Sequence, residues 1–334
     1  MAVELRDSPI FICGHPKAGT SLLRGILDSH PQLIVYPEEA VFFRRFLNKA
    51  GGLRLDDQLD LADELLIHIF TWNRSNPPPS QAGFPDRDYS AIPFEAVRQA
   101  MRRILAAGGC RHAGDILSAA IVAFGEVSGQ LHDETRYWVE KSPYNELYTE
   151  LIYRWWPQAR CIHIVRDPRD NYASYRRKHP DWRPEFFAVN WKRSTRAGVR
   201  NQQKFGMPRY WLARYEDLVQ SPQAFLEQLT QFLDISWDPA LTTPQRAGLT
   251  WQGNSMFAER FQAISTAPLG RWKESLSPQE AVLIEQLTQP LFDMVGYVRS
   301  TPPSLKGRFQ AWSWPLRRRF SCRLVSKKDD SDDE

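Results

Sequence analysis

Pro9-Ile-Phe-Ile-Cys-Gly-His-Pro-Lys-Ala-Gly-Thr20 is the stretch that decides the fold of this 334-residue chain. Its continuous apolar run, residues 10–13, is typical of a strand that is buried on both faces of a parallel sheet. Residues 14–19 follow as a turn, and from Thr20 apolar residues recur at helical spacing until His30. The stretch therefore predicts a strand, a loop and a helix whose first N–H groups favour an anion.

The loop nearly matches the phosphate-binding pattern G-x-x-x-x-G-K-[ST]. Gly14 and Gly19 have the required spacing, but Thr20 occupies the place of the lysine, and the lysine lies inside the loop as Lys17. The alternative interpretation is an ordinary glycine-containing turn between a strand and a helix. The loop alone does not decide between these interpretations.

A second motif follows another predicted strand, residues 161–165. Arg166-Asp167-Pro168 begins a helix there, because aspartate is a favoured N-cap and proline a favoured first helical residue. Arg166 offers a bidentate fork at the strand end, and Ser174, two helical turns along, can offer a hydroxyl to the same anion. A capped helix with a surface ion pair is the alternative interpretation of this motif taken alone.

Together the two motifs resemble those of the sulfotransferases that use 3′-phosphoadenosine 5′-phosphosulfate (PAPS). Pro16-Lys17-Ala18-Gly19-Thr20 resembles the 5′-phosphosulfate loop, with Ala18 where the family usually has Ser, Thr or Gly. Arg166 and Ser174 resemble the 3′-phosphate motif. The motif style is closest to the tyrosylprotein, heparan and bacterial-type branches. The resemblance implies an α/β, P-loop-like three-layer fold with a central parallel sheet flanked by helices.

The resemblance also implies catalytic roles. In the tyrosylprotein and heparan branches a glutamate after the second strand is the general base, and this role falls here on Glu39, with Glu38 as the alternative. Acidic residues at a helix N-terminus would also explain both glutamates. Lys141 resembles the lysine that supports the transferring group, and Lys17 would stabilise the leaving phosphate.

The predicted donor contacts come from the two motifs and from two later segments. Tyr215 follows the last predicted parallel strand, and Ser255 and Arg271 lie in a long loop that closes over PAPS in relatives. The full predicted set is His15, Pro16, Lys17, Ala18, Gly19, Thr20, Ser21, Arg166, Ser174, Tyr215, Ser255 and Arg271. No metal is expected.

Composition and length predict one domain over residues 1–300, with a helical insertion at 51–136 between the second and third strands. Residues 301–334 form a basic and then acidic tail that we expect to be mobile. Weak contact of its basic residues with an anionic glycan or membrane surface is the alternative. A net charge of +4 gives no reason to expect a nucleic-acid partner. Four isolated cysteines are expected to be reduced and buried, and the lack of an apolar membrane-spanning run predicts a cytoplasmic protein without a transmembrane segment.

The resemblance therefore implies sulfuryl transfer from PAPS to a hydroxyl or amine acceptor, which could be a carbohydrate, lipid, small molecule or peptide. A P-loop kinase or NTPase is one alternative, although it would need a lysine at the position that Thr20 occupies. A non-catalytic binder of sulfated glycans is another, which would explain the basic tail but not two phosphate motifs. The acceptor and the oligomeric state are left open by the sequence.

Overall fold

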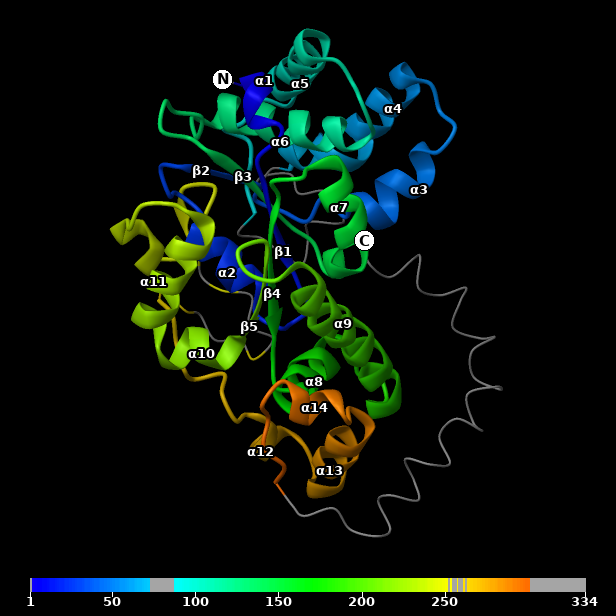
Figure 1. Cartoon of the computed structure of the whole chain (residues 1–334), viewed down its shortest axis with the longest axis vertical. Coiled ribbons are helices and arrows are strands. Elements are labelled where there is room, and N and C mark those ends of the chain that lie inside the picture. The colour runs from blue at the N-terminus through cyan, green and yellow to red at the C-terminus, as the bar shows by residue number, and fades with distance from the viewer. Residues whose placement is uncertain are drawn as a thin grey trace.

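The structure, a computed structural model, describes residues 2–72, 87–251, 253, 257, 261 and 263–300. Five parallel strands form one sheet in the order β2-β3-β1-β4-β5 (Figure 1). The strands are β1 (Pro9–Cys13), β2 (Leu33–Val35), β3 (Tyr137–Lys141), β4 (Arg160–Val165) and β5 (Tyr210–Arg214). Helices flank the sheet, so the predicted α/β class with a central parallel sheet is confirmed.

Both faces of the sheet are buried, as the apolar run of β1 predicts. Ile10 and Ile12 face α2 (Thr20–Leu27), α10 (Tyr215–Gln220) and α11 (Pro222–Leu233). Phe11 and Cys13 face the opposite way, because side chains alternate along a strand, and they pack in a core with residues of α5 (Phe94–Gly108) and α6 (Gly114–Ser128). Consecutive residues of one strand thus support both helical layers.

Helical segments fill the connection between β2 and β3 and gather beyond one end of the sheet (Figure 1). The segments are η1 (Phe42–Phe46), α3 (Leu47–Ala50), α4 (Leu55–Ala62), η2 (Asp63–Ile67), η3 (His68–Thr71), α5 (Phe94–Gly108) and α6 (Gly114–Ser128). The single helix that periodicity predicts over 60–72 is instead the end of α4, a π-helical turn and a 3₁₀ turn. Buried Leu65, Leu66 and Ile67 explain the change, because three consecutive apolar residues pack into the core together.

The remaining helical segments lie along the sheet and beyond its other end (Figure 1). They are η5 (Asn145–Tyr148), α7 (Thr149–Trp155), α8 (Pro168–Lys178), α9 (Pro184–Phe205), η6 (Pro239–Thr242), α12 (Trp272–Ser275), α13 (Pro278–Leu287) and α14 (Leu291–Met294). The short helix α1 (Ala2–Leu5) precedes β1. After η6, the strands β6 (Gln245–Arg246) and β7 (Leu249–Thr250) form a separate antiparallel pair. The amphipathic spacing of residues 278–295 alone predicts one helix, but the structure shows that this helix ends at Leu287, before Pro290. A proline has no N–H to continue the helix and clashes with the preceding turn.

The cysteines and the tail complete the comparison with the sequence. Cys13 and Cys161 are buried free thiols as expected, whereas Cys110 is exposed because it lies in the turn between α5 and α6. Among the described residues, no helix has both the length and the apolar content that crossing a bilayer requires. The predicted tail, 301–334, lies outside the described residues, and the limits predicted for the domain and its insertion stay predictions.

Trp138 provides a test of the core. This side chain is fully buried on β3, and its ring makes edge contacts with Phe11 and Trp156. Trp138→Ala should lower the free energy of unfolding by about 3–5 kcal/mol, because the truncation removes these contacts and leaves a cavity. Urea denaturation measures the change. Trp237→Ala is the matched control, since Trp237 is 42% exposed, and an equal loss in both variants would contradict this account of the core.

Candidate functional site

The loop after β1 needs glycine at both of its ends. Gly14 has φ +141°, and a Cβ there would lie 2.5 Å from the carbonyl oxygen of Ile164 on β4. Gly19 has φ +104°, and a Cβ there would lie 2.3 Å from the ring of Tyr215. The two glycines therefore let the loop pass against β4 and against the residue that follows β5.

Buried polar side chains hold the loop from outside. The carboxylate of Glu146, which is fully buried, accepts a hydrogen bond of 2.9 Å from the N–H of Gly14. The amide of Asn171 donates 2.8 Å to the carbonyl of Pro16 and contacts the ring nitrogen Nδ1 of His15 at 3.1 Å. Beyond the loop, α2 begins at Thr20 and leaves its first N–H groups without partners in the helix. These N–H groups suit an anion.

Arg166 joins the second predicted motif to the loop. Its guanidinium donates to the carbonyl of Lys17 at 3.1 Å and to the carbonyl of Pro268 at 3.0 Å, and it lies 4.6 Å from the centre of the Tyr215 ring. Its Nε is buried and has no hydrogen-bond partner among the described residues. A buried donor without a partner is costly, so this Nε favours an acceptor such as a phosphate oxygen.

The two motifs line one pocket. Lys17, Gly19, Thr20, Ser21, Arg166, Ser174, Tyr215 and Arg271 are the predicted donor contacts that lie along its wall. Trp251, Phe257 and Phe261 add aromatic side chains that the sequence analysis did not single out. Segments that follow β1, β4 and β5 thus meet in a pocket with cations, hydroxyls and aromatic rings, which suits a phosphorylated nucleotide.

Three predicted donor contacts are not among the described residues that line this pocket. Pro16 and Ala18 are not part of its lining. His15 is 2% exposed, and its ring packs against Tyr144, Tyr175 and Phe187 behind the loop. Burial lowers the pKa of His15 to about 4, which keeps the imidazole neutral. Ser255 lies outside the described residues.

Glu39 and Glu38 have different environments although they are adjacent. The carboxylate of Glu39 accepts a hydrogen bond from Lys141 and is 40% exposed. Partial desolvation raises the pKa of Glu39, but the charge and the hydrogen bond of Lys141 outweigh this effect and hold the pKa below its ordinary value. Glu38 is buried, accepts 2.6 Å from the hydroxyl of Tyr89 and pairs with Arg87 at 3.1 Å. Of the two glutamates, only Glu39 is therefore both exposed and in contact with Lys141, the other predicted catalytic residue.

The amine of Lys17 is partly desolvated at the pocket. Burial lowers its pKa to about 8, and the nearby cations Lys178 and Lys141 act in the same direction, while Glu39 acts against them. Lys17 itself has φ +63°, a left-handed conformation that non-glycine residues seldom adopt. The site therefore holds a lysine whose charge is disfavoured until an anion arrives.

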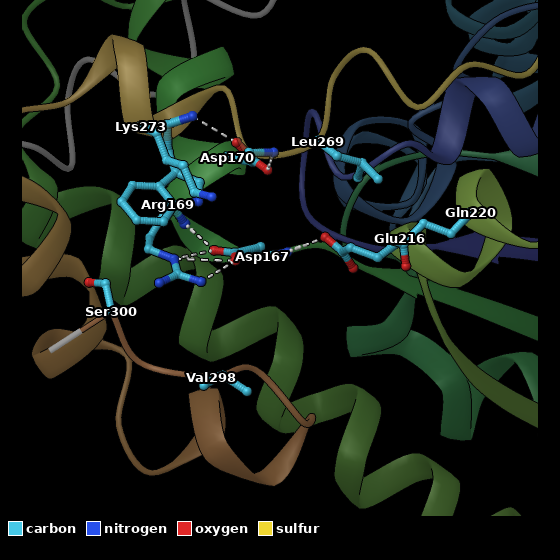
Figure 2. A pocket seen from close by; sticks show the side chains of 11 residues that line it. Asp167, Arg169, Asp170, Glu216, Gln220, Leu269, Lys273, Val298 and Ser300 are labelled. Carbon is cyan, nitrogen blue, oxygen red and sulfur yellow. Dashed lines mark hydrogen bonds and ion pairs between the residues drawn. The ribbon is translucent and has the colours of Figure 1, made fainter. Parts of the chain in front are cut away.

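A second pocket lies beside the same turn after β4, but it is acidic (Figure 2). Its lining includes Asp167, Asp170 and Glu216, together with Arg169 and Lys273. The three carboxylates already accept hydrogen bonds within the protein, and each would repel a phosphate. Asp170 holds the N–H groups of Gly270 and Trp272 at 2.7 and 2.9 Å, which fixes the segment that carries Arg271 into the first pocket.

Comparison with known proteins identifies the family. Residues 9–239 match the sulfotransferase family. The chain belongs to the sulfotransferase family. Protein-tyrosine sulfotransferase A of Caenorhabditis elegans is 23% identical over 316 residues, which span 91% of this chain and 71% of that protein. A putative protein-tyrosine sulfotransferase of Caenorhabditis briggsae is 24% identical, over 87% of this chain and 90% of its own.

Solved structures of sulfotransferases share the fold. The sulfotransferase domain of the Synechococcus olefin synthase has a TM-score of 0.56 at 23% identity and covers 88% of this chain and 96% of its own. The sulfotransferase domain from the curacin biosynthetic pathway has a TM-score of 0.52 at 18% identity, with 86% and 97% covered. This sulfotransferase is therefore a transferase with the central sheet of its family.

Two loop-supporting residues of the sulfotransferase escaped the sequence analysis. Asn171 lies between Arg166 and Ser174 in the sequence, and Glu146 follows Lys141 by five positions. In the sequence each is simply a polar residue within a helical segment. The structure shows that both side chains are fully buried. Such a position cannot be told from an exposed one without the packed structure.

The pKa of Lys17 is directly testable. Its side-chain ¹³C signal, assigned by its loss in Lys17→Ala, should titrate near pH 8 instead of near the ordinary value of about 10.5. Inorganic pyrophosphate should raise this pKa, because an anion in the pocket favours the ammonium form. A titration near the ordinary value in the free protein would contradict the desolvated placement of Lys17.

Proposed function

We propose that this sulfotransferase transfers a sulfuryl group from PAPS to a hydroxyl or amine of an acceptor. The observation that carries the proposal is the meeting of the Lys17 loop and Arg166 in one pocket, although β1 and β4 lie far apart in the sequence. Each motif alone has an ordinary structural explanation. Their convergence on one anion-binding pocket supports a donor with phosphate groups at two positions.

The residues present fit PAPS. The N-terminus of α2 and Lys17 would hold the 5′-phosphosulfate, and the buried Nε of Arg166 with the hydroxyl of Ser174 would hold the 3′-phosphate. Tyr215 and the aromatic residues of the pocket offer surfaces for the adenine ring. When bound, PAPS would supply the sulfuryl group and a phosphate leaving group.

The reacting side chains act mainly through charge and position. Lys17 would stabilise charge on the leaving phosphate, and Lys141 would stand beside the sulfuryl oxygens. Glu39 would take the proton of the acceptor, and its lowered pKa keeps it ionised and ready to do so. Glu38 is a poorer candidate for the base because Tyr89 and Arg87 already occupy its carboxylate.

The acceptor class stays broad in this proposal. Two relatives are named for protein tyrosine, which makes a phenolic hydroxyl the first acceptor to test. Hydroxyls or amines of carbohydrates, lipids and small molecules are the acceptors to test next. The cytoplasmic location, the absence of a nucleic-acid partner and any weak surface contact of the tail stay predictions.

Calorimetry with adenosine 3′,5′-bisphosphate tests the donor. We expect micromolar binding without added metal and at least tenfold weaker binding of ATP with Mg²⁺, because ATP lacks the 3′-phosphate that Arg166 would hold. Preference for ATP with Mg²⁺ would favour a P-loop kinase or NTPase instead. Binding of heparin but of neither nucleotide would favour a sulfated-glycan binder.

Arg166→Ala should chiefly weaken donor binding. A 3′-phosphate fork acts on the ground state and the transition state alike, so KM for PAPS should rise about 10–100-fold while kcat changes little. Steady-state release of adenosine 3′,5′-bisphosphate with a tyrosine peptide as acceptor measures both constants. Arg209→Ala is the control, because this arginine packs on Tyr153 away from the pocket. Unchanged KM with lost kcat would show that the motif has been misinterpreted.

Glu39→Gln tests the base. The variant keeps shape and hydrogen bonding but removes proton affinity, so kcat should fall ~10²-fold or more while the affinity for adenosine 3′,5′-bisphosphate stays within a few-fold. Glu38→Gln, measured beside it, should have a smaller effect. If both single variants and the double variant keep kcat within a few-fold, neither glutamate is the base.

A further inference from the structure

The turn that carries Glu39 contains a strained residue. Val41, two positions later, has φ +46° and ψ +31°. This left-handed conformation is a genuine outlier for a β-branched side chain, and such residues persist only where their surroundings hold them in place. The turn would relax toward ordinary backbone angles if nothing held it, and Glu39 would move with it.

Two side chains from the end of β3 hold this turn. The carboxylate of Glu140 accepts a hydrogen bond of 3.2 Å from the N–H of Ala40, and the hydroxyl of Ser142 accepts one of 2.8 Å from the N–H of Val41. Ser142 in turn donates to Glu140. The two consecutive N–H groups after Glu39 therefore both end on side chains of one short segment.

The same segment carries the partner of Glu39. Lys141 lies between Glu140 and Ser142 in the sequence, and it is the residue whose amine contacts the Glu39 carboxylate. Three consecutive residues thus fix the backbone after Glu39 and meet its side chain. These three residues lie at the end of β3, between β2 and β1 in the central sheet. The contacts with them therefore fix the position of Glu39 relative to the sheet.

Glu140 is costly to keep in this position. It is 1% exposed, and burial raises its pKa, while hydrogen bonds from Ser142 and Asn145 act in the opposite direction. A buried carboxylate without such bonds would strongly destabilise the fold. An apolar side chain would fill the same space at lower cost, so the packing of the core does not account for an acid here.

We propose that Glu140 and Ser142 are positioning residues that hold the turn at Ala40 and Val41 so that Glu39 stays against Lys141 and open to the acceptor. This inference rests on the proposed function, in which Glu39 is the base. It assigns no contact with substrate to either residue. It explains together the strained Val41, the buried Glu140 and the hydroxyl at position 142.

Ser142→Ala is the test, and Ser118→Ala is its matched control. Ser118 is also a fully buried serine with a hydrogen-bonded hydroxyl, but it lies on α6 and donates to the carbonyl of Asp115. Both variants lose one buried hydroxyl, so a general effect on stability should appear in both. An effect on Glu39 should appear only in Ser142→Ala.

The first measurement needs no acceptor. In protein labelled with [5-¹³C]glutamate, the Glu39 signal is assigned by its loss in Glu39→Gln. Its pKa should rise in Ser142→Ala and stay unchanged in Ser118→Ala, because a loosened turn separates Glu39 from Lys141. The other charges that act on Glu39 come from Arg87, Arg44 and Lys17, and neither substitution alters them. An unchanged pKa in Ser142→Ala overturns the inference.

The second measurement separates positioning from general stability. With a tyrosine peptide and PAPS, kcat of Ser142→Ala should fall about 10–100-fold, as expected when a catalytic group is displaced, while the affinity for adenosine 3′,5′-bisphosphate stays within twofold. The acid limb of the pH–rate profile should move to higher pH. Equal losses of kcat, affinity and thermal stability with an unmoved acid limb overturn the inference.

Failure of the proposed function has a different signature. Wild-type protein that does not bind adenosine 3′,5′-bisphosphate refutes the donor assignment, and an active Glu39→Gln variant refutes the base. An inactive Glu39→Gln variant together with a fully active Ser142→Ala variant refutes only the positioning roles of Glu140 and Ser142.

Discussion

The place of β1 between β3 and β4 decides where every charge of the site lies. Parallel strands end at the same edge of a sheet, so the loop after β1 receives side chains from the end of each neighbour. The register pairs Ile12 with Lys141 on one side and Cys13 with His163 on the other. Lys141 therefore reaches one flank of the loop, and Arg166, three positions past His163, reaches the other.

This arrangement concentrates positive charge before any ligand arrives. Lys17, Lys141 and Arg166 follow or end strands at one edge of the sheet, and burial together with the charges of Lys178 and Lys141 lowers the pKa of Lys17 to about 8. An anion with two phosphate positions would relieve this repulsion. Glu39 forms an ion pair with Lys141, and its exposure leaves it accessible to an acceptor. The unfavourable charge of the free site would thus favour binding of an anionic donor.

The sequence predicted the sheet and the loop because both depend on local patterns. The apolar run of β1 and the two glycines of the loop need no distant partner to be recognised. The choice between Glu38 and Glu39 could not be made in that way, because it depends on Tyr89, which is 51 positions away. The burial of the His15 ring behind the loop could not be predicted for the same reason. Its aromatic neighbours Tyr144 and Phe187 come from segments that only the folded chain brings together.

The loop shows how support and ligand binding can use opposite ends of the same peptide groups. Asn171 donates to the carbonyl of Pro16, and Arg166 donates to the carbonyl of Lys17. In a trans peptide the carbonyl and the N–H point in opposite directions, so a carbonyl held by Asn171 turns the N–H of Lys17 away from that support. Arg166 would then serve the anion twice, once through its own Nε and once by fixing the backbone of Lys17. Asn171 and Arg166 therefore hold two consecutive peptide groups of the loop by their carbonyls, which leaves the N–H groups of Lys17 and Ala18 directed away from these supports.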